Sequence, residues 1–512
     1  ASRGLGDVYK RQIITGRMPV VGTFLPVPSS PVRLLNIYNS GWWPSGLGHS
    51  EAAPTAAGLL GLANVVFIGN HGLLRTLLVL GPLLLGFVGM FHVSAVFRSG
   101  RGRLAALVAY AVNPLPYSCL AAGRWAPVVV YGALPWALEL LRRSSGLQAA
   151  SAVADASGKE ITDAVAVVGL ARQVRLIAAL ALLEAVVATF VPSFPLLVVM
   201  VAAVLAVSTL AARGTIASLA AVGSAALAAL VAFVLHLPWS LRFIDTGGWT
   251  DFVGAGNGGS SLGLGRLVRF EIGHVPVAFF ALALWVPLLV GVLLAKGWRL
   301  TWMARAGGLT MVFGALAIAG DSGTRLPETG VLLVPVAMAL ALSAAIAVCA
   351  FDEDVKGATI GWRQPVALLG FAALAVSLVP AVAGVGDGRW QVPTPELAGT
   401  LGSLPTDPPT GDFRVLYLGD ARLLPLPGRP YRDGLAYAIA DDGPLDVLDT
   451  WAPRPSAGDA AIVQALDAIS SHSTLRGGRL LAPLGIEMRH ADARRRHRTQ
   501  RRLARAASAR RD

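Results

Sequence analysis

The sequence predicts an α-helical polytopic membrane protein with about ten or eleven transmembrane helices and a small C-terminal α/β domain outside the cytoplasm. Three observations lead to this fold class. Hydrophobic residues make up 54% of the 512 residues and charged residues only 14%, against about 25% charged residues in an average soluble domain. Apolar stretches of membrane-spanning length recur up to Val385. Beyond Val385 the composition changes to Pro-rich linkers and short β-rich runs.

A predicted helical hairpin lies near the start of these apolar stretches. Leu104 to Ala122 and Ala126 to Leu141 are each apolar over about the length that crosses a bilayer, and the turn Gly123-Arg124-Trp125 joins them. Arginines precede the first arm and follow the second. Because Lys and Arg concentrate in cytoplasmic loops, both outer ends of the hairpin are predicted to be cytoplasmic and the turn to lie on the opposite face.

Other apolar stretches are predicted to cross the membrane as well: Leu73 to Phe97, Val174 to Val191, Pro195 to Ala212, Gly214 to Leu237, Val275 to Ala295, Ala304 to Gly320, Val331 to Ala350 and Pro365 to Val385. Pro54 to Gly69 is apolar but short, and it suits a span, a re-entrant segment or an interfacial helix equally well.

The basic residues of the predicted loops support this topology over its inverse. The predicted cytoplasmic loops carry Arg98, Arg101, Arg103, Arg142, Arg143, Lys159, Arg172, Arg213, Lys296, Arg299, Arg305, Lys356 and Arg363. The predicted outer loops carry Arg124, Arg242, Arg266, Arg269 and Arg325. The chain is therefore expected in the plasma membrane, with everything after Val385 outside the cytoplasm.

Four regions follow from these patterns. ASRGLGDVYKRQ at the start has neither signal-peptide nor helix character, and residues 1–30 are predicted to be a non-native or truncated segment. Residues 31–386 form the polytopic transmembrane domain, and residues 387–488 form the extracytoplasmic α/β domain. Residues 489–512 are basic and are predicted to be disordered or out of frame. This tail supplies much of the net charge of +13, so the charge does not indicate nucleic acid as a partner.

Polar and aromatic side chains accumulate on the predicted outer face. An ionisable group in or beside the membrane is costly, which makes such residues candidates for function. A carboxylate can serve as the general base for an acceptor hydroxyl, and the candidates are Glu51, Asp245, Asp251 and Asp321. An arginine can bind a phosphate bidentately and a Trp face can stack on a sugar. The candidates for substrate binding are Trp42, Trp43, Asn113, Tyr117, Arg124, Trp125 and Arg325.

Each of these features also has a structural explanation, which the sequence leaves open. Trp42 and Trp43 suit interfacial anchors, because indole rings favour the headgroup level. Asp321 and Arg325 suit a loop ion pair, and Arg124 suits an anchor to lipid phosphate.

Several other patterns carry less weight. Gly254, Gly256 and Gly259 match a dinucleotide-binding spacing, but they do not follow a strand and do not face the cytoplasm. Glu184 lies within a predicted span and suits either a packed, protonated group or part of an ion path. The eight histidines show no metal-ligand spacing. Neither a metal nor another cofactor is expected.

Several phrases resemble the polytopic envelope glycosyltransferases of actinobacteria. They are GWWPSGLG at 41–48 with the PTAAGLLGL that follows, AYAVNPLPYSCLAAGRW at 109–125, FRVLYLGDARLLPLPG at 413–428 and GLAYAIADDG at 434–443. The family includes arabinofuranosyltransferase-like proteins with a C-type membrane glycosyltransferase fold. It also includes relatives in which a cytoplasmic family 2 glycosyltransferase domain precedes a similar membrane region.

The resemblance implies transfer of a sugar from a polyprenyl-phosphate-linked donor to a cell-envelope polysaccharide on the outer face. The catalytic acid of C-type enzymes usually lies in the first outer loop, which the region ending at Glu51 would represent here. The upstream part of that loop is missing, so the chain is expected to be a fragment. Two other functions stay open: a transporter of lipid-linked glycans, and a non-catalytic scaffold for envelope glycan assembly.

Overall fold

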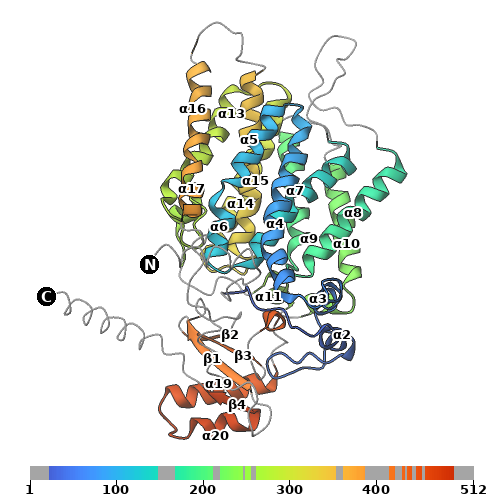
Figure 1. Cartoon of the computed structure of the whole chain (residues 1–512), viewed down its shortest axis with the longest axis vertical. Helices are drawn as coiled ribbons and strands as arrows, with labels where there is room; N and C mark the ends of the chain where they lie inside the picture. The colour runs from blue at the N-terminus through green and yellow to red at the C-terminus, as the bar shows by residue number, and fades with distance from the viewer. Residues whose placement is uncertain are drawn as a thin grey trace, which may run out of the picture.

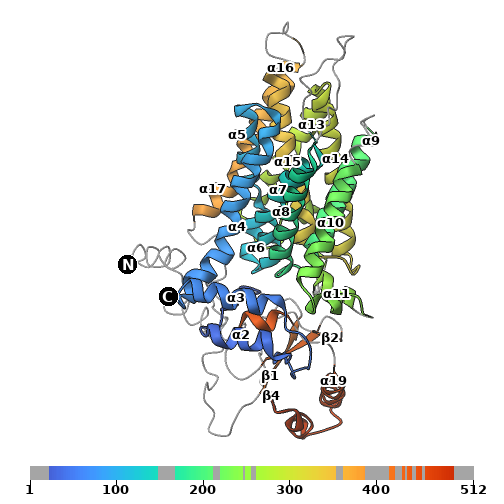
Figure 2. The same ribbon diagram turned by 90° about the vertical axis from the view of Figure 1, so that its right-hand side faces the viewer.

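The computed structural model describes residues 22–147, 168–211, 219–245, 248–254, 261–352, 361, 363–386, 414–420, 429–432, 435–440, 446–451 and 456–488. These residues form a bundle of long helices with a small sheet at one end, which we call the sheet end (Figures 1 and 2). The short helices α2 (Pro31–Ser40) and α3 (Thr55–Val66) lie beside the sheet at this end.

The bundle is built from α4 (His71–Val93), η1 (Ser94–Phe97), α5 (Gly100–Ala111), α6 (Pro114–Ala121), α7 (Trp125–Ser145), α8 (Leu170–Ala188), α9 (Phe194–Ala211), α10 (Leu219–Leu235), η4 (Ala278–Trp285), α13 (Val286–Leu294), α14 (Trp298–Asp321), α15 (Thr329–Ala350), α16 (Arg363–Val376) and α17 (Leu378–Gly386). Between α10 and η4 the chain forms three short elements at the sheet end, η3 (Trp239–Phe243), α11 (Gly248–Val253) and α12 (Leu264–Val268). Here η marks a 3-10 helix.

Five helices of the described chain are long and apolar enough to cross a membrane. They are His71–Phe97, Gly100–Ala121, Trp298–Asp321, Thr329–Ala350 and Arg363–Gly384. Shorter apolar helices cover Thr55–Val66, Phe194–Leu210, Leu219–Leu235 and Ala278–Leu294. The 12 residues of α3 extend over about 18 Å, well short of a hydrocarbon core of about 30 Å. The ambiguous stretch from Pro54 to Gly69 is therefore too short to be a crossing helix.

Three of the predicted continuous spans are interrupted. The first arm of the hairpin divides into α5 and α6, because Pro114 has no N–H to continue the helix and the Asn113 side chain accepts the N–H of Leu115 at 2.9 Å. The span from Val275 begins as the 3-10 helix η4 and continues as α13. The last span is interrupted at Ser377, between α16 and α17.

The most buried helix is α15, whose residues from Thr329 to Ala350 are all buried. Its apolar residues occupy every face, as expected for a helix enclosed by others. Elsewhere the outward faces stay apolar and exposed, as at Leu84 of α4 and Leu289 of α13. Exposed apolar faces on this scale are expected where helices contact lipid.

The two arms of the hairpin are joined by a pair of buried tyrosines. The rings of Tyr110 on α5 and Tyr131 on α7 stack with centroids 4.0 Å apart. The hydroxyl of each tyrosine donates a hydrogen bond to the backbone carbonyl of the other. Both buried hydroxyls therefore have a hydrogen-bond partner.

The sheet contains β1 (Arg414–Asp420), β2 (Arg429–Arg432), β3 (Leu435–Ala440) and β4 (Ile486–Met488), in the order β2-β3-β1-β4. β3 is antiparallel to β1 and β2, and β4 is parallel to β1. α19 (Ala457–Ser470) and α20 (Gly477–Leu481) contribute Ile462, Leu466 and Leu481 to a core shared with the strands. Helices and strands thus form one small packed unit, as the sequence predicts. The 3-10 helices η6 (Val447–Thr450) and η7 (Ala482–Leu484) complete this unit.

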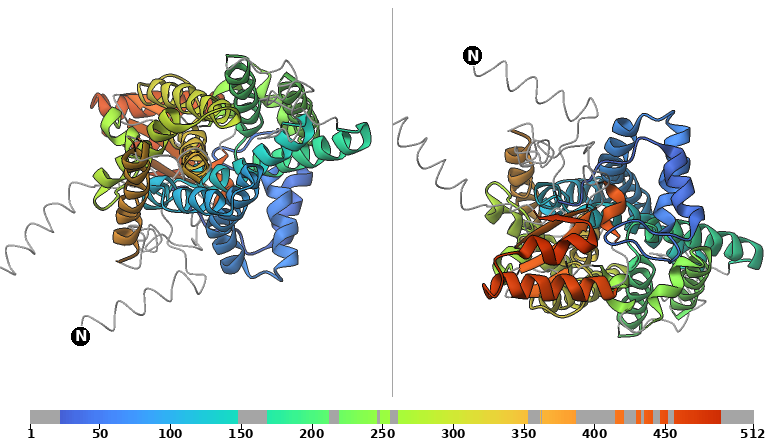
Figure 3. Two further views of the ribbon diagram at one scale, coloured as in Figure 1. Left: turned by 90° about the horizontal axis from the view of Figure 1, so that it is seen from above. Right: turned by 90° about the horizontal axis from the view of Figure 1, so that it is seen from below.

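The segment before α2 joins the sheet unit to the bundle. Phe24, Leu25 and Val27 are buried, although the sequence analysis set residues 1–30 apart. The N–H of Val447 donates to the carbonyl of Pro26 at 2.8 Å, and Thr23 donates to Gly123 at the hairpin turn. The view from below in Figure 3 shows the sheet unit (orange to red) against this end of the bundle. Residues 1–21 and 489–512 lie outside the described residues.

Candidate active site

A buried arginine joins two of the predicted carboxylates at the sheet end. The side chain of Arg242 in η3 is only 8% exposed. Its Nη1 donates to Oε1 of Glu51 at 2.8 Å, and its Nη2 donates to Oδ2 of Asp251 at 2.8 Å. Glu51 comes from the loop between α2 and α3, and Asp251 comes from α11. We call these three residues the Arg242 cluster.

A glycine allows α11 to approach η3 closely enough for this pairing. Gly248 begins α11, and its N–H donates to the carbonyl of Asp245 at 2.8 Å. A Cβ atom at Gly248 would lie 2.3 Å from the backbone oxygen of Arg242, closer than any side chain can come. Asp251 therefore reaches Arg242 because the turn between the two elements has no side chain at this position.

The two carboxylate oxygens of Glu51 have different surroundings. Oε1 accepts the hydrogen bond from Arg242, whereas Oε2 is buried without a hydrogen bond. Oε2 lies 3.7 Å from Nδ1 of His49, which also has no hydrogen bond. One oxygen thus fixes the orientation of the carboxylate, and the other has lone pairs that no hydrogen bond occupies. A general base requires both properties.

Aromatic side chains extend from the cluster along η3 and α11. The ring centroids of Trp239 and Phe243 are 5.0 Å apart, those of Phe243 and Phe252 are 5.5 Å apart, and those of Phe252 and Trp249 are 5.7 Å apart. Trp249 is 45% exposed, and its indole donates to the carbonyl of Arg325 at 2.8 Å. We call these four residues the aromatic row. It offers an exposed ring face next to a charged cluster.

The other two predicted carboxylates lie in different surroundings. Asp321, at the end of α14, accepts the N–H groups of Leu262 and Gly263 at 2.9 and 3.0 Å. It is therefore bonded to the chain after α11, and not in the predicted ion pair with Arg325. Asp245 follows η3 in the turn that leads to α11.

The two neighbouring tryptophans of the first loop differ in burial. Trp43 is fully buried, and its indole donates to the carbonyl of Trp451 at 2.8 Å. Ser45 donates to Oδ1 of Asp449 at 3.2 Å. Trp42 is 51% exposed and lies over Gly48. Trp43 thus attaches the loop that carries Glu51 to the sheet unit, and Trp42 alone offers a free ring.

The predicted binding residues of the hairpin have structural partners. Asn113 caps α6, and the indole of Trp125 donates to the carbonyl of Leu78 at 3.0 Å. Nε of Arg124 lies 3.7 Å from Oε1 of Glu328. Burial raises the pKa of Glu328, and the charge of Arg124 lowers it in part.

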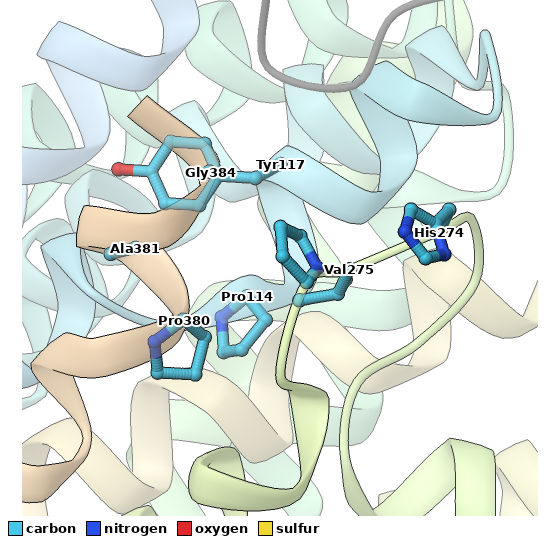
Figure 4. A pocket seen from close by; sticks show the side chains of 8 residues that line it. Pro114, Tyr117, His274, Val275, Pro380, Ala381 and Gly384 are labelled. Carbon is cyan, nitrogen blue, oxygen red and sulfur yellow. The ribbon is translucent and has the colours of Figure 1, made fainter. Parts of the chain in front are cut away.

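Tyr117 lines a small cavity between the start of α6, the segment before η4 and α17 (Figure 4). Its hydroxyl donates to the carbonyl of Ala111 at 2.6 Å. The cavity has a volume of about 20 Å³, which is room for about one water molecule. It is too small for a sugar.

The structure therefore brings together Glu51 and Asp251 from the predicted carboxylates, with Arg242 and His49, which the sequence also places in the predicted outer loops. Trp239, Phe243 and Phe252 are not among the residues that the sequence nominated. The i, i+4 spacing of Trp239 and Phe243 is visible in the sequence, but their position beside Glu51 is not. Among the described residues, no group of His, Cys, Asp or Glu is arranged to hold a metal ion.

The fold and this site define a helical protein with apolar spans and a polar cluster at one end of its bundle. Comparisons with family models, with curated proteins and with solved structures give no match.

Proposed function

We propose that the protein is a membrane glycosyltransferase, or the membrane module of one. It would transfer a sugar from a polyprenyl-phosphate-linked donor to a cell-envelope glycan on the outer face of the plasma membrane. The observation that supports the proposal is the carboxylate of Glu51, whose Oε1 accepts a hydrogen bond from Arg242 while Oε2 accepts none. The resemblance of the first loop to envelope glycosyltransferases points to the same residue.

In this mechanism Oε2 of Glu51 accepts the proton of an acceptor hydroxyl. The acceptor oxygen forms a bond to the anomeric carbon, the bond from that carbon to the phosphate oxygen breaks, and the polyprenyl phosphate leaves with its electron pair. The aromatic row stacks on the sugar, and Arg325, whose carbonyl binds Trp249, contributes a guanidinium for the phosphate. Arg242 positions the base.

The topology that this function needs has ten crossings. The crossing elements would be α4, α5 with α6, α7, α8, α9, α10, η4 with α13, α14, α15, and α16 with α17. An even number of crossings returns the chain to the side on which it began. The position of α2 and of the sheet unit at the same end of the bundle agrees with this parity (Figure 1). The predicted bias of Lys and Arg places this end outside the cytoplasm.

The test compares Glu51→Gln with Asp251→Asn. Each substitution removes one ion pair with Arg242, so a purely structural cluster predicts similar effects of the two. A general base at Glu51 predicts a loss of transfer of about 10²-fold to 10⁴-fold in Glu51→Gln alone. The measurement is transfer of radiolabelled sugar from polyprenyl-phosphate arabinofuranose to an arabinan oligosaccharide by the purified full chain.

Asp321→Asn serves as the control for a carboxylate bound to backbone. It should keep transfer within a few-fold of the unchanged chain, because one amide oxygen can still accept one of the two N–H groups. Equal losses in Glu51→Gln and Asp251→Asn, with equal losses in thermal stability, would favour the scaffold function over catalysis.

A further inference from the structure

A second cavity lies at the opposite end of the bundle, far from the Arg242 cluster. It has a volume of about 400 Å³ and is formed by α5, α15 and α16. Figures 1 and 2 show the ends of these three helices together, away from the sheet. The lining side chains are mostly apolar: Leu104, Ala105, Val108, Val348, Phe351, Phe371 and Leu374. We call this cavity the α5–α16 groove.

The groove opens toward the lipid-facing surface of the bundle. Leu104 is 57% exposed on its α5 side and Phe371 is 39% exposed on its α16 side. The neighbouring Leu368 of α16 is also exposed. Pockets that bind small molecules have volumes of about 300 to 1,000 Å³ and mostly apolar linings, and this cavity meets both criteria. A ligand that enters from this side comes from the bilayer.

Charge is concentrated at the mouth of the groove. Nη1 of Arg101 lies 3.0 Å from Oδ1 of Asp352, and both residues line the cavity. The side chain of Arg101 is 70% exposed, so most of its five N–H donors stay available. Arg101 is the one cation among the residues that line the described cavity, and Asp352 occupies only one of its N–H groups.

We propose that the α5–α16 groove binds one anionic phospholipid of the surrounding membrane. An acyl chain lies between Leu104 and Phe371, and the headgroup phosphate accepts hydrogen bonds from Arg101. Basic residues at the end of apolar helices are the setting in which membrane proteins bind acidic headgroups. This site is separate from the glycosyltransferase proposal, and neither depends on the other.

The test uses the full chain in phosphatidylcholine vesicles that contain a minor fraction of phosphatidylglycerol with a photoactivatable acyl chain. After illumination, mass spectrometry maps the labelled peptides. Labels are expected on the peptides that contain Leu104 and Phe371. Arg101→Gln should lower this labelling about tenfold, as expected for the loss of one charge-assisted hydrogen bond. Leu104→Trp, which fills the groove from its exposed side, should lower it as well.

Two matched controls separate a defined site from general contact with lipid. Arg175→Gln removes an exposed arginine of α8, and Leu84→Trp enlarges an exposed apolar side chain of α4. Neither should change the labelling of the groove. Asp352→Asn should raise it, because Asp352 competes with the phosphate for Arg101. Labelling that is equal with a phosphatidylcholine probe, or that falls equally in Arg175→Gln, overturns the proposal.

Discussion

At the scale of single residues, the burial of the charged side chain of Arg242 carries a large desolvation cost. A guanidinium that is 8% exposed loses most of its hydration, and the two carboxylates of Glu51 and Asp251 replace it. Removing one member of such a group lowers the free energy of unfolding by more than the whole group contributes to it, because the remaining charges stay buried without a partner. The cluster therefore joins the loop of Glu51, η3 and α11, and the loss of any one member should destabilise all three connections.

Arg242→Gln should lower the free energy of unfolding by about 3 to 5 kcal/mol, since it leaves Glu51 and Asp251 without their cation. Adding Glu51→Gln and Asp251→Asn to the same chain should restore much of this loss, because no uncompensated charge remains. The measurement is the apparent melting temperature in detergent. A triple variant no more stable than Arg242→Gln would show that packing, and not charge, accounts for the effect.

Asp321 has the opposite character, because its two oxygens bind only backbone N–H groups. Asp321→Ala should lower the free energy of unfolding by about 1 to 3 kcal/mol, because two hydrogen bonds to a charged acceptor are lost and water replaces them only in part. Hydrogen exchange at the amides of Leu262 and Gly263 should accelerate in the variant. Ser322→Ala, at the exposed neighbouring position, is the control and should leave both amides unchanged.

At the scale of elements, small residues set the distance between α4 and α7. A Cβ atom at Gly132 of α7 would lie 2.5 Å from the backbone oxygen of Pro82 in α4. The two helices therefore touch backbone to backbone at this crossing, as small residues permit in membrane bundles.

Gly132→Ala should destabilise the bundle by about 1 to 3 kcal/mol, because the added methyl group forces the two helices apart. Gly81→Ala in α4 is the matched control, since nothing lies within 4 Å of a Cβ atom there. It should be neutral or slightly stabilising, as Ala favours the helix over Gly. Thermal unfolding of both variants in the same detergent measures the difference. Equal melting temperatures would contradict the close crossing.

The contact between the first loop and η6 contains a buried carboxyl group that titrates near neutrality. Burial and the negative charge of Asp446 raise the pKa of Asp449 from 3.8 to about 7, against the smaller opposing effects of the Asp446 N–H, Ser45 and Arg33. The folded state therefore binds a proton that the unfolded state has lost between about pH 4 and about pH 7. Stability from this group must fall as the pH rises through that window.

Asp449→Asn should remove this dependence. The melting temperature of the unchanged chain should fall relative to that of Asp449→Asn between about pH 4 and about pH 7, since only the unchanged chain acquires a buried charge. The comparison cancels the titration of groups that do not interact with Asp449. Parallel melting curves across this range would mean that Asp449 is already ionised at the lower pH.

At the scale of the whole molecule, the bundle has two chemically different ends. The sheet end carries the Arg242 cluster and the aromatic row, and the opposite end carries Arg98, Arg101 and Arg103. Both cysteines of the chain, Cys119 and Cys349, are buried thiols that form no disulfide. New cysteines at either end can therefore report on orientation.

Leu475→Cys lies in the exposed turn before α20, and Arg172→Cys lies at the exposed start of α8, in a predicted cytoplasmic loop. A thiol reagent that does not cross membranes should label Leu475→Cys in intact cells, and should label Arg172→Cys only after the cells are opened. This result is expected because basic loops stay in the cytoplasm. The reverse pattern would place the Arg242 cluster on the cytoplasmic face and remove the basis for an extracytoplasmic reaction.

The sequence by itself determined the helical, apolar character of the chain and the approximate positions of its long helices. A helix that crosses a bilayer needs a continuous apolar stretch of about 20 residues. Such a stretch can be recognised from neighbouring residues alone, as from Thr329 to Ala350. The change to a small α/β unit after the last helix is also local. Asn113-Pro114 is a helix-breaking pair that is visible in the sequence. The predicted span was nevertheless continuous, because the apolar stretch around this pair has the length of a whole crossing.

Only the tertiary structure decided which polar residues meet. Glu51 and Arg242 are 191 positions apart, and nothing in either local sequence specifies the other. The same holds for Trp43 and Trp42, which are neighbours in the chain but differ in burial because only one faces Trp451. Contacts between distant segments depend on how whole elements pack. Residue type alone could therefore nominate Glu51 and Asp321, but it could not distinguish a carboxylate paired with an arginine from one bound to backbone N–H groups.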